Sequence, residues 1–237
     1  MDSRGEAHRL PKGGASSARA DGTVSGGRTK RCFDVAFAGS VCLLLSPLLG
    51  IVAVLVRLND GGVVFHRGAR VGINGTPFRI FKYRTMVVEA ESVGGSSTPD
   101  DDPRITWIGR VLRKYKIDEL PQLLNVLRGE MSLVGPRPQV AWAVALYSDA
   151  ERELLAVRPG MTDYASILFR DEGALLKGAD DPDGAYLARI APEKMRLGLE
   201  YLRHRTLWTD VKILLATLGA IAGIDPRRCL DFARGRS

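Results

Sequence analysis

The stretch between Phe33 and Leu58 limits the possible folds of this chain more than any other part of the sequence. Its residues are apolar or small, and the exceptions are Asp34, Ser40, Ser46 and Arg57. About 20 apolar residues suffice for a helix to cross the hydrocarbon core of a bilayer. Hydropathy alone therefore allows a single transmembrane helix.

Two features of this stretch favour a different path through the membrane. Ser46-Pro47 lies in its middle, where a proline removes one backbone hydrogen bond and kinks the helix. Basic residues flank both ends, namely Arg28, Lys30 and Arg31 before it and Arg57, Arg67 and Arg70 after it. A spanning helix carries its basic excess on the cytoplasmic side only. We therefore predict a re-entrant helix-break-helix over residues 28–60, in which the Ser46 hydroxyl bonds to the carbonyl that the proline frees.

Composition narrows the chemistry of the rest of the chain. The net charge of +7 favours an anionic partner, which is nucleic acid, anionic lipid or a phosphorylated substrate. The basic segments lack interleaved stacking aromatics, which argues against nucleic acid. The three histidines are scattered, which argues against a zinc site, so a bound metal would be a hard cation such as Mg²⁺. Three cysteines without a CxxC pair predict no disulfide framework.

The chain divides into three parts. Residues 1–27 are rich in Gly, Ser, Ala and Arg and cannot bury enough apolar surface to fold, so they predict a disordered tail. Residues 28–60 form the membrane helix, and residues 61–237 form one membrane-associated domain. We expect an α+β fold that is mainly helical, with amphipathic helices and a short β-hairpin.

The hairpin is expected between Val63 and Thr85. Asn74-Gly75 is a strong turn signal, and the arm that follows it mixes apolar and basic residues. Lys82 and Arg84 are then close together on a short strand next to the membrane. They are either solvated surface charges or ligands for a phosphate.

An acidic run from Asp100 to Asp102 precedes a basic amphipathic segment. The run is either a metal-binding cluster or the entry to a helix, and we favour a helix in which Asp102 is the N-cap and Pro103 the first residue. Apolar residues then recur at intervals of three and four, and they include Trp107. Such a helix lies on an anionic membrane surface or packs as an ordinary surface helix.

Asp118-Glu119 has two interpretations. Neighbouring side chains on a helix point about 100° apart, so the two carboxylates would divide the work between a substrate and a metal. Alternatively, Asp118 is only the N-cap of a helix from Glu119 to Leu127 that ends at Gly129. The second interpretation leaves Arg113, one helical turn earlier, unexplained.

Pro136-Arg137-Pro138 predicts a rigid turn, because proline restricts the backbone on both sides of the arginine. A guanidinium held in this way suits a phosphate or a nucleobase, and the alternative is a rigid linker with a solvated arginine. Further patterns predict helices over residues 142–157 and 193–222, a turn over residues 158–162 and a short strand over residues 164–169.

Four runs resemble the blocks of the bacterial sugar transferase family, the monotopic phosphoglycosyl transferases that start glycan assembly on polyprenol phosphate. The runs are Phe65 to Met86, Asp102 to Thr106, Asp118 to Pro138 and Arg158 to Thr162. The resemblance covers about residues 30–220. Several long motifs in the right order make it specific.

The resemblance implies a reaction and a role for each site residue. Asp118 would attack the β-phosphate of a UDP-sugar, release UMP and become a phosphosugar ester, from which polyprenyl (undecaprenyl) phosphate takes the sugar phosphate. Glu119 would hold Mg²⁺. The substrate-binding residues would be Lys82, Arg84, Arg113, Arg137 and Arg158.

The resemblance also implies a cellular place. A re-entrant helix broken at Ser46-Pro47 would hold the domain on the cytoplasmic face of the bacterial inner membrane. The product would begin exopolysaccharide, O-antigen or glycoprotein glycan synthesis. Many family members continue the last block with Gly-Trp, but this chain has Asp163-Tyr164, so we do not carry over a sugar. A homodimer is left open, and a non-catalytic scaffold that binds anionic lipid is the alternative to an enzyme.

Overall fold

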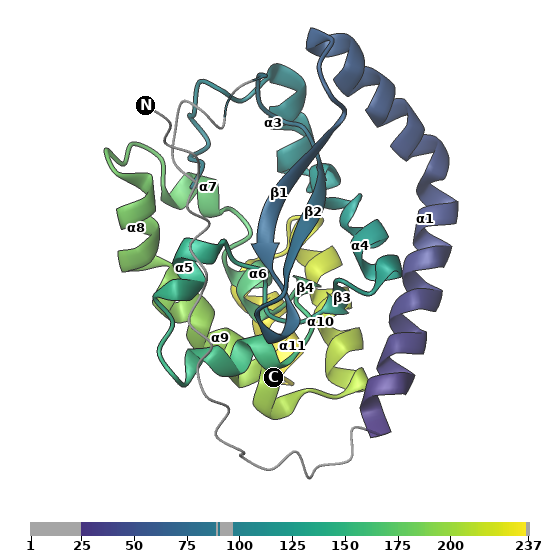
Figure 1. Cartoon of the computed structure of the whole chain (residues 1–237), viewed down its shortest axis with the longest axis vertical. Coiled ribbons are helices and arrows are strands. Elements are labelled where there is room, and N and C mark those ends of the chain that lie inside the picture. Colours follow the sequence, from purple (N-terminus) through teal and green to yellow (C-terminus); the bar gives the residue numbers. More distant parts are fainter. Residues whose placement is uncertain (1–24, 89, 91–96, 236–237) are drawn as a thin grey trace, which may run out of the picture.

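The computed structural model describes residues 25–88, 90 and 97–235. These residues form a mainly helical fold with two small sheets of two strands each (Figure 1). The tail predicted for residues 1–27 lies outside the described residues, except for residues 25–27, which begin the first helix.

Helix α1 (Ser25–Asp60) contains the apolar stretch and lies along one side of the molecule (Figure 1). The helix continues through Pro47, so the structure does not show the predicted break. The Ser46 hydroxyl donates to the Leu43 carbonyl at 2.8 Å. This is the carbonyl that the missing amide hydrogen of Pro47 leaves free. The predicted role of the Ser46 hydroxyl is confirmed, and the satisfied carbonyl helps the helix to continue.

The two faces of α1 have different surroundings. On one face Val52 and Val56 are buried in a cluster with Tyr83, Ile108 and Leu112. The exposed large apolar residues of its second half are Leu43, Leu44, Leu48, Ile51, Val54, Leu55 and Leu58. Among the described residues, only α1 is long and apolar enough to cross a membrane.

Strands β1 (Phe65–Val71) and β2 (Pro77–Tyr83) form the predicted antiparallel hairpin. Asn74 and Gly75 in the connecting turn have φ angles of 55° and 77°. These are left-handed values that glycine and asparagine adopt most readily. Lys82 lies at the end of the hairpin opposite this turn.

Helix α3 (Trp107–Lys114) begins later than predicted. Its N-cap is Thr106, whose hydroxyl accepts a hydrogen bond from the Gly109 amide at 3.0 Å. The predicted cap, Asp102, instead forms an ion pair with Arg104 at 2.6 Å. The Asp102 carboxylate, which was expected to cap a helix, is thus bonded to Arg104 instead.

A second, parallel sheet consists of β3 (Ser132–Val134) and β4 (Gly160–Thr162). The turn predicted for residues 158–162 therefore contains a strand. Gly160 permits the close approach of the two segments, because a Cβ at this position would lie 2.1 Å from the amide nitrogen of Gly135.

The strand predicted for residues 164–169 is wrong, and helix α6 (Tyr164–Leu168) takes its place. The Asp163 carboxylate accepts a hydrogen bond from the Ser166 amide at 2.7 Å. This N-cap stabilises the first turn of a helix and outweighs the strand preference of the aromatic and branched residues.

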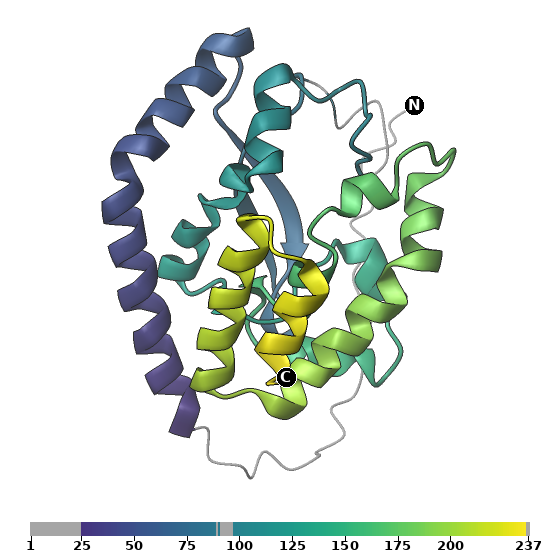
Figure 2. The same ribbon diagram turned by 180° about the vertical axis from the view of Figure 1, so that it is seen from behind.

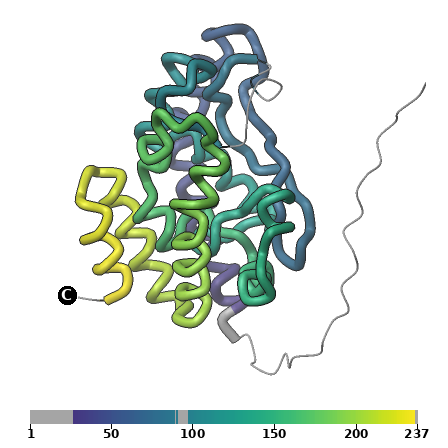
Figure 3. The backbone as a smooth tube through the Cα atoms, turned by 90° about the vertical axis from the view of Figure 1, so that its left-hand side faces the viewer, coloured from purple at the N-terminus to yellow at the C-terminus, as the bar shows by residue number. Residues whose placement is uncertain are grey.

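Several more helices complete the domain (Figures 1 and 2). They are α5 (Ala141–Ala145), η3 (Glu151–Ala156), α7 (Glu172–Leu175), α8 (Pro182–Arg189), α9 (Ala191–His204), α10 (Leu207–Ile221) and α11 (Pro226–Arg234). The helices predicted over residues 142–157 and 193–222 are each divided, the second because Thr206 caps a new helix through the Thr209 amide. Figure 3 shows α10 and α11, in yellow, along one edge of the molecule.

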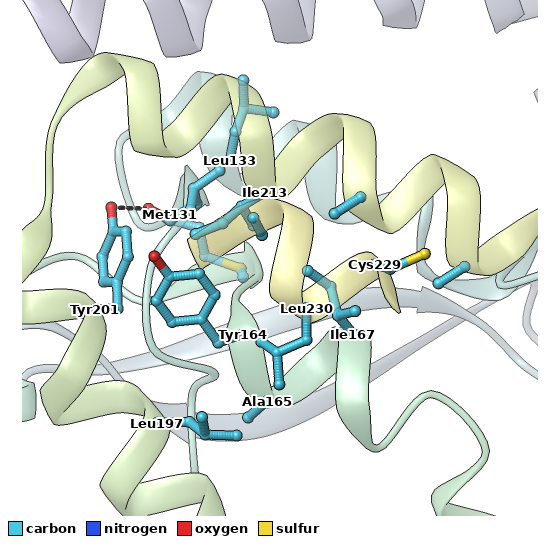
Figure 4. Close-up of a cluster of buried hydrophobic side chains, with 14 of the residues drawn as sticks. Met131, Leu133, Tyr164, Ala165, Ile167, Leu197, Tyr201, Ile213, Cys229 and Leu230 are labelled. Atoms are coloured by element: carbon cyan, nitrogen blue, oxygen red, sulfur yellow. Dashed lines mark hydrogen bonds between the residues drawn. The ribbon is translucent and has the colours of Figure 1, made fainter. Parts of the chain in front are cut away.

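The main hydrophobic core lies where α6, α9, α10 and α11 meet the parallel sheet (Figure 4). Tyr164 and Tyr201 lie edge to face in it, with ring centroids 6.3 Å apart. Leu197 and Ile213 are fully buried beside them. This core fixes β3 and β4, and the loop that leaves β3 carries Arg137.

Candidate active site

The carboxylate pair lies on a short turn between two helices. Asp118 and Glu119 belong to the 3-10 helix η2 (Ile117–Glu119), and helix α4 (Gln122–Arg128) begins after it. Lys116 precedes the turn with a φ of 56°, a left-handed value that is strained for a lysine. Asp118 therefore does not cap a helix that starts at residue 119, and that interpretation is wrong.

The Glu119 carboxylate accepts from two cations that come from distant parts of the chain. Its Oε1 atom lies 2.7 Å from Lys82 Nζ on β2 and 2.8 Å from Arg137 Nη2 in the loop after β3. Burial alone would raise the pKa of Glu119, but Arg137 and Lys82 outweigh it and hold the pKa far below its usual range. Glu119 is thus a fixed negative charge.

The Asp118 carboxylate is buried and incompletely bonded. Its residue is 6% exposed, and its Oδ1 atom has no hydrogen-bond partner among the described residues. Burial raises the pKa of Asp118, and the negative charge of Glu119 raises it further, whereas Lys82 and Arg113 lower it. An unpaired buried carboxylate is costly to the fold, which is typical of a reactive group.

Arg113 completes the surroundings of Asp118. Its Nε atom donates to the Thr85 hydroxyl at 2.9 Å, and the guanidinium forms no ion pair among the described residues. Burial lowers its pKa, against the attraction of Asp118. A partly buried guanidinium without a carboxylate partner suits the phosphate of a ligand.

The Arg137 side chain is bonded to other elements and is not the solvated arginine of the alternative interpretation. Besides Glu119, it donates to the Met161 carbonyl on β4 and, at 3.4 Å, to the Gln122 side chain. A small hollow lined by Arg137 and its two flanking prolines adjoins this arginine. Polar groups around it include those of Gln139 and Asp163.

Gln122 is a site residue that the sequence reasoning missed. The residue is fully buried, its Oε1 faces Arg137, and its Nε2 has no partner among the described residues. Its position four residues after Asp118 is the one sequence signal that could have found it, because residues four apart share a face of a continuous helix.

Two of the five predicted cations are not joined to the carboxylate pair. Both terminal nitrogens of Arg84 bond to Asp60 at the end of α1. Arg158 is exposed and donates from Nε to the Gly129 carbonyl at 2.9 Å. The structure thus groups Lys82, Arg113 and Arg137 with the pair, while Arg84 and Arg158 contact other elements. Ser46 and Pro47 lie within α1.

The donor set can be tested for fit to the expected Mg²⁺. No group of three or more metal-binding side chains occurs among the described residues. The two adjacent carboxylates, one with an unpartnered oxygen, offer hard oxygen ligands. Mg²⁺ commonly binds one or two carboxylates and takes its other ligands from substrate phosphates and water. The residues present therefore fit a cation that arrives with a diphosphate.

Comparison with known proteins identifies a family that matches most of this chain. A sequence model of the family described as bacterial sugar transferase matches residues 26–223. The exopolysaccharide production protein ExoY of Rhizobium meliloti (strain 1021) is 38% identical over 211 residues, which cover 83% of this chain and 86% of that protein.

Two further relatives are named for particular sugars. The UDP-glucose:undecaprenyl-phosphate glucose-1-phosphate transferase of Caulobacter vibrioides is 38% identical, over 83% of this chain and 70% of its own length. The UDP-N-acetylgalactosamine-undecaprenyl-phosphate N-acetylgalactosaminephosphotransferase of Aeromonas hydrophila is 36% identical, over 81% of this chain and 43% of its own length. These two relatives are thus named for the same acceptor and for different sugars.

Proposed function

Because the chain belongs to the bacterial sugar transferase family, we propose that it is a phosphoglycosyl transferase that moves a sugar 1-phosphate from a UDP-sugar to polyprenyl phosphate. The observation that carries the proposal is the buried Asp118 carboxylate, whose Oδ1 atom has no hydrogen-bond partner within the part of the chain that the structure describes. It lies beside Glu119, which Lys82 and Arg137 hold in place.

The first step forms a covalent intermediate on Asp118. A carboxylate oxygen attacks the β-phosphorus of the UDP-sugar, and the bond from this phosphorus to the bridging oxygen breaks. UMP leaves with that oxygen and with the electron pair of the broken bond. The sugar phosphate then remains as an acyl phosphate ester of Asp118.

The second step returns the carboxylate. An oxygen of polyprenyl phosphate attacks the same phosphorus, the bond to Asp118 breaks, and polyprenyl-diphosphate-sugar is released. Two displacements divide one difficult transfer into two easier ones. The lipid product would start exopolysaccharide, O-antigen or glycoprotein glycan synthesis.

The cations around the pair stabilise charge on the phosphates. Arg113 and Arg137 would bind phosphate oxygens, and Lys82 would orient Glu119. Glu119 is the residue that would hold Mg²⁺, and the bound ion would neutralise part of the diphosphate charge. Loss of the repulsion from Glu119 on metal binding would also favour the ionised form of Asp118.

We also propose that α1 enters the membrane without crossing it. Near its start Lys30 forms an ion pair with Asp210 at 2.5 Å, and at its end Asp60 forms one with Arg84. Both ends of α1 are thus bonded to one folded domain. Such a domain lies on one side of a bilayer, so the exposed apolar residues of α1 would insert into the cytoplasmic leaflet.

The covalent step has a direct test. Protein in lipid nanodiscs is mixed with a panel of UDP-sugars that carry a labelled sugar, without the lipid acceptor. We expect stoichiometric UMP release and acid-stable label on Asp118 with the correct sugar, followed by transfer of the label to lipid when undecaprenyl phosphate is added. Asp118→Asn should take up no label, whereas Ser40→Ala, on the exposed face of α1, should behave as the wild type. Undiminished turnover in Asp118→Asn would refute the mechanism, and lipid binding without UMP release from any donor would favour the scaffold.

The topology has its own test. Cys32 is exposed near the start of α1, and Val63→Cys in a Cys32→Ser background reports the other end. A membrane-impermeant maleimide should label both positions in inverted membrane vesicles and neither in intact spheroplasts. Labelling of the two positions from opposite sides would show that α1 spans the membrane.

A further inference from the structure

The first turns of α1 make polar contacts that differ from those of an ordinary membrane anchor. Asp34 is 2% exposed although it belongs to the apolar helix. Its Oδ2 accepts from the Ser132 hydroxyl at 2.7 Å, and its Oδ1 accepts from the Leu133 amide at 3.3 Å. The Asp34 carboxylate thus accepts hydrogen bonds from the first two residues of β3.

Arg31, about one helical turn before Asp34, contacts a second element. Arg31 donates to the carbonyls of Val126 and Leu127 at 2.6 and 3.0 Å, at the end of α4. The Val126 carbonyl also accepts from the Gly129 amide at 3.0 Å. Both carbonyls belong to the last turn of α4, whose carbonyls lack the regular partners of a helix interior.

A buried network surrounds the Asp34 carboxylate on its other side. Lys30 Nζ lies 3.9 Å from Asp34 and 2.5 Å from Asp210 of α10. Asp210 in turn accepts from the Tyr201 hydroxyl at 2.7 Å. Lys30 is therefore the cation that faces both buried carboxylates, and the network leaves Asp34 aimed at β3.

Strand β3 leads directly to the active-site arginine. Its last pairing to β4 is followed by the bond from the Gly135 amide to the Thr162 carbonyl at 3.0 Å, and then by Pro136 and Arg137. Arg137 contacts both β4, through the Met161 carbonyl, and Glu119. A short strand of three residues has few bonds of its own to set its position, so its anchor at Ser132 matters.

We propose that Asp34 is a positioning residue, which sets the place of β3 and through it the contact of Arg137 with Glu119. The membrane helix is then part of the active-site framework as well as an anchor. The inference rests on the proposed function for its kinetic readout, and a structural readout is independent of it.

The kinetic test is a double-mutant cycle. Asp34→Asn and Asp34→Ala should lower kcat/KM for the UDP-sugar on the order of 10- to 100-fold, since small displacements of positioning groups have effects of this size. In an Arg137→Met background the same substitutions should cause no further loss, because the arginine they position is gone. In an Arg113→Met background, the loss of kcat/KM from the Asp34 substitution should multiply the loss from Arg113→Met. Equal losses in all three backgrounds would show a general structural role and overturn the inference.

The structural test uses hydrogen exchange, which needs no activity. Asp34→Asn in nanodiscs should speed amide exchange in residues 132–138, with exchange in the hairpin of residues 65–83 unchanged. Ser132→Ala removes only the hydroxyl partner of Asp34, and it should produce the same pattern to a smaller degree. This variant keeps the test available if Asp34→Ala fails to fold. Ser40→Ala is the matched control on α1. An exchange rate that rises uniformly over the domain, or that does not change at all, would overturn the positioning role. An inactive wild type with the expected exchange pattern would refute only the proposed function.

Discussion

Arg137 and Glu119 lie 18 residues apart in the sequence, yet Arg137 Nη2 donates to Glu119 Oε1 at 2.8 Å. The other terminal nitrogen of Arg137 donates to the Met161 carbonyl on β4. The Arg137 guanidinium therefore bonds both to Glu119 of the carboxylate pair and to the parallel sheet. Substrate phosphates that enter this site meet an arginine whose position is already fixed.

Arg137→Met should reduce kcat/KM for the UDP-sugar by about 10²–10³-fold, a loss of the size seen when one preorganised donor to developing charge is removed. Arg137→Lys keeps the charge but cannot reach Glu119 and Met161 with the same fork, so we expect an intermediate loss. Initial rates of UMP release measure both. An Arg137→Lys variant with wild-type kinetics would show that charge alone matters.

Asp118→Asn should raise the Tm at neutral pH while it abolishes labelling. The pKa of Asp118 is raised in the folded protein, so the stability from its protonated form is full below its ordinary pKa and is lost as the pH rises through the raised pKa. Above its ordinary pKa the folded wild type therefore loses stability, because burial opposes the ionised form of Asp118, and asparagine, which does not ionise, avoids this loss. The gain should disappear when unfolding is followed below about pH 4, the ordinary range of an aspartate. Asp149→Asn, an exposed control, should leave the Tm unchanged.

Lys82→Met should shift the acid limb of the pH–rate profile to higher pH. Asp118 must be ionised to attack phosphorus, and Lys82 is the cation that lowers its pKa most. The profile of kcat/KM for the free enzyme reports this ionisation. Lys212→Met, on α10, should leave the limb in place, and an unmoved limb in Lys82→Met would argue against Asp118 as the titrating group.

Gly160→Ala should lower both stability and activity. The added Cβ would meet Gly135 backbone atoms at 2.1 to 2.6 Å, so β3 and β4 must separate. Overpacking of this kind costs about 1–3 kcal/mol or more. Chemical denaturation in nanodiscs gives the change in the free energy of unfolding. Gly50→Ala in α1, where nothing lies within 4 Å, is the control that should not be destabilising.

Ser46→Ala should weaken α1 by about 1–3 kcal/mol, the cost of a carbonyl left without a partner in an apolar medium. The Ser46 hydroxyl is bonded to the Leu43 carbonyl, which Pro47 leaves free. Ser40 makes the same kind of bond to the Ala36 carbonyl, but no proline follows it. Ser40→Ala should therefore have a smaller effect on the Tm, and equal effects would show that the proline adds nothing.

Local signals predicted some elements well. The Asn74-Gly75 turn and the Gly129 helix end were correctly predicted, because left-handed backbone values select these residue types. Predictions failed where a side chain found a partner close by in the chain. Asp102 paired with Arg104 instead of capping a helix, and Asp163 began a helix where a strand was expected.

The candidate site shows the same division. The sequence motifs assigned Lys82, Arg113 and Arg137 to substrate binding, and the structure places all three beside the carboxylate pair. Arg84 and Arg158 belong to the same motifs, but they bond to Asp60 and to the Gly129 carbonyl. Motif membership does not tell which element a long side chain will reach.

The sequence by itself determined the apolar helix, the hairpin turn, the family and the identity of the acidic pair. Each of these depends on residue types at short spacing. Only the tertiary structure decided that Asp118 is buried with an unpartnered oxygen, that Glu119 is shared by Lys82 and Arg137, and that Asp34 reaches from the membrane helix to β3. The reason is physical: burial and long-range pairing depend on how distant segments pack, and the spacing of residues along the chain does not contain that information.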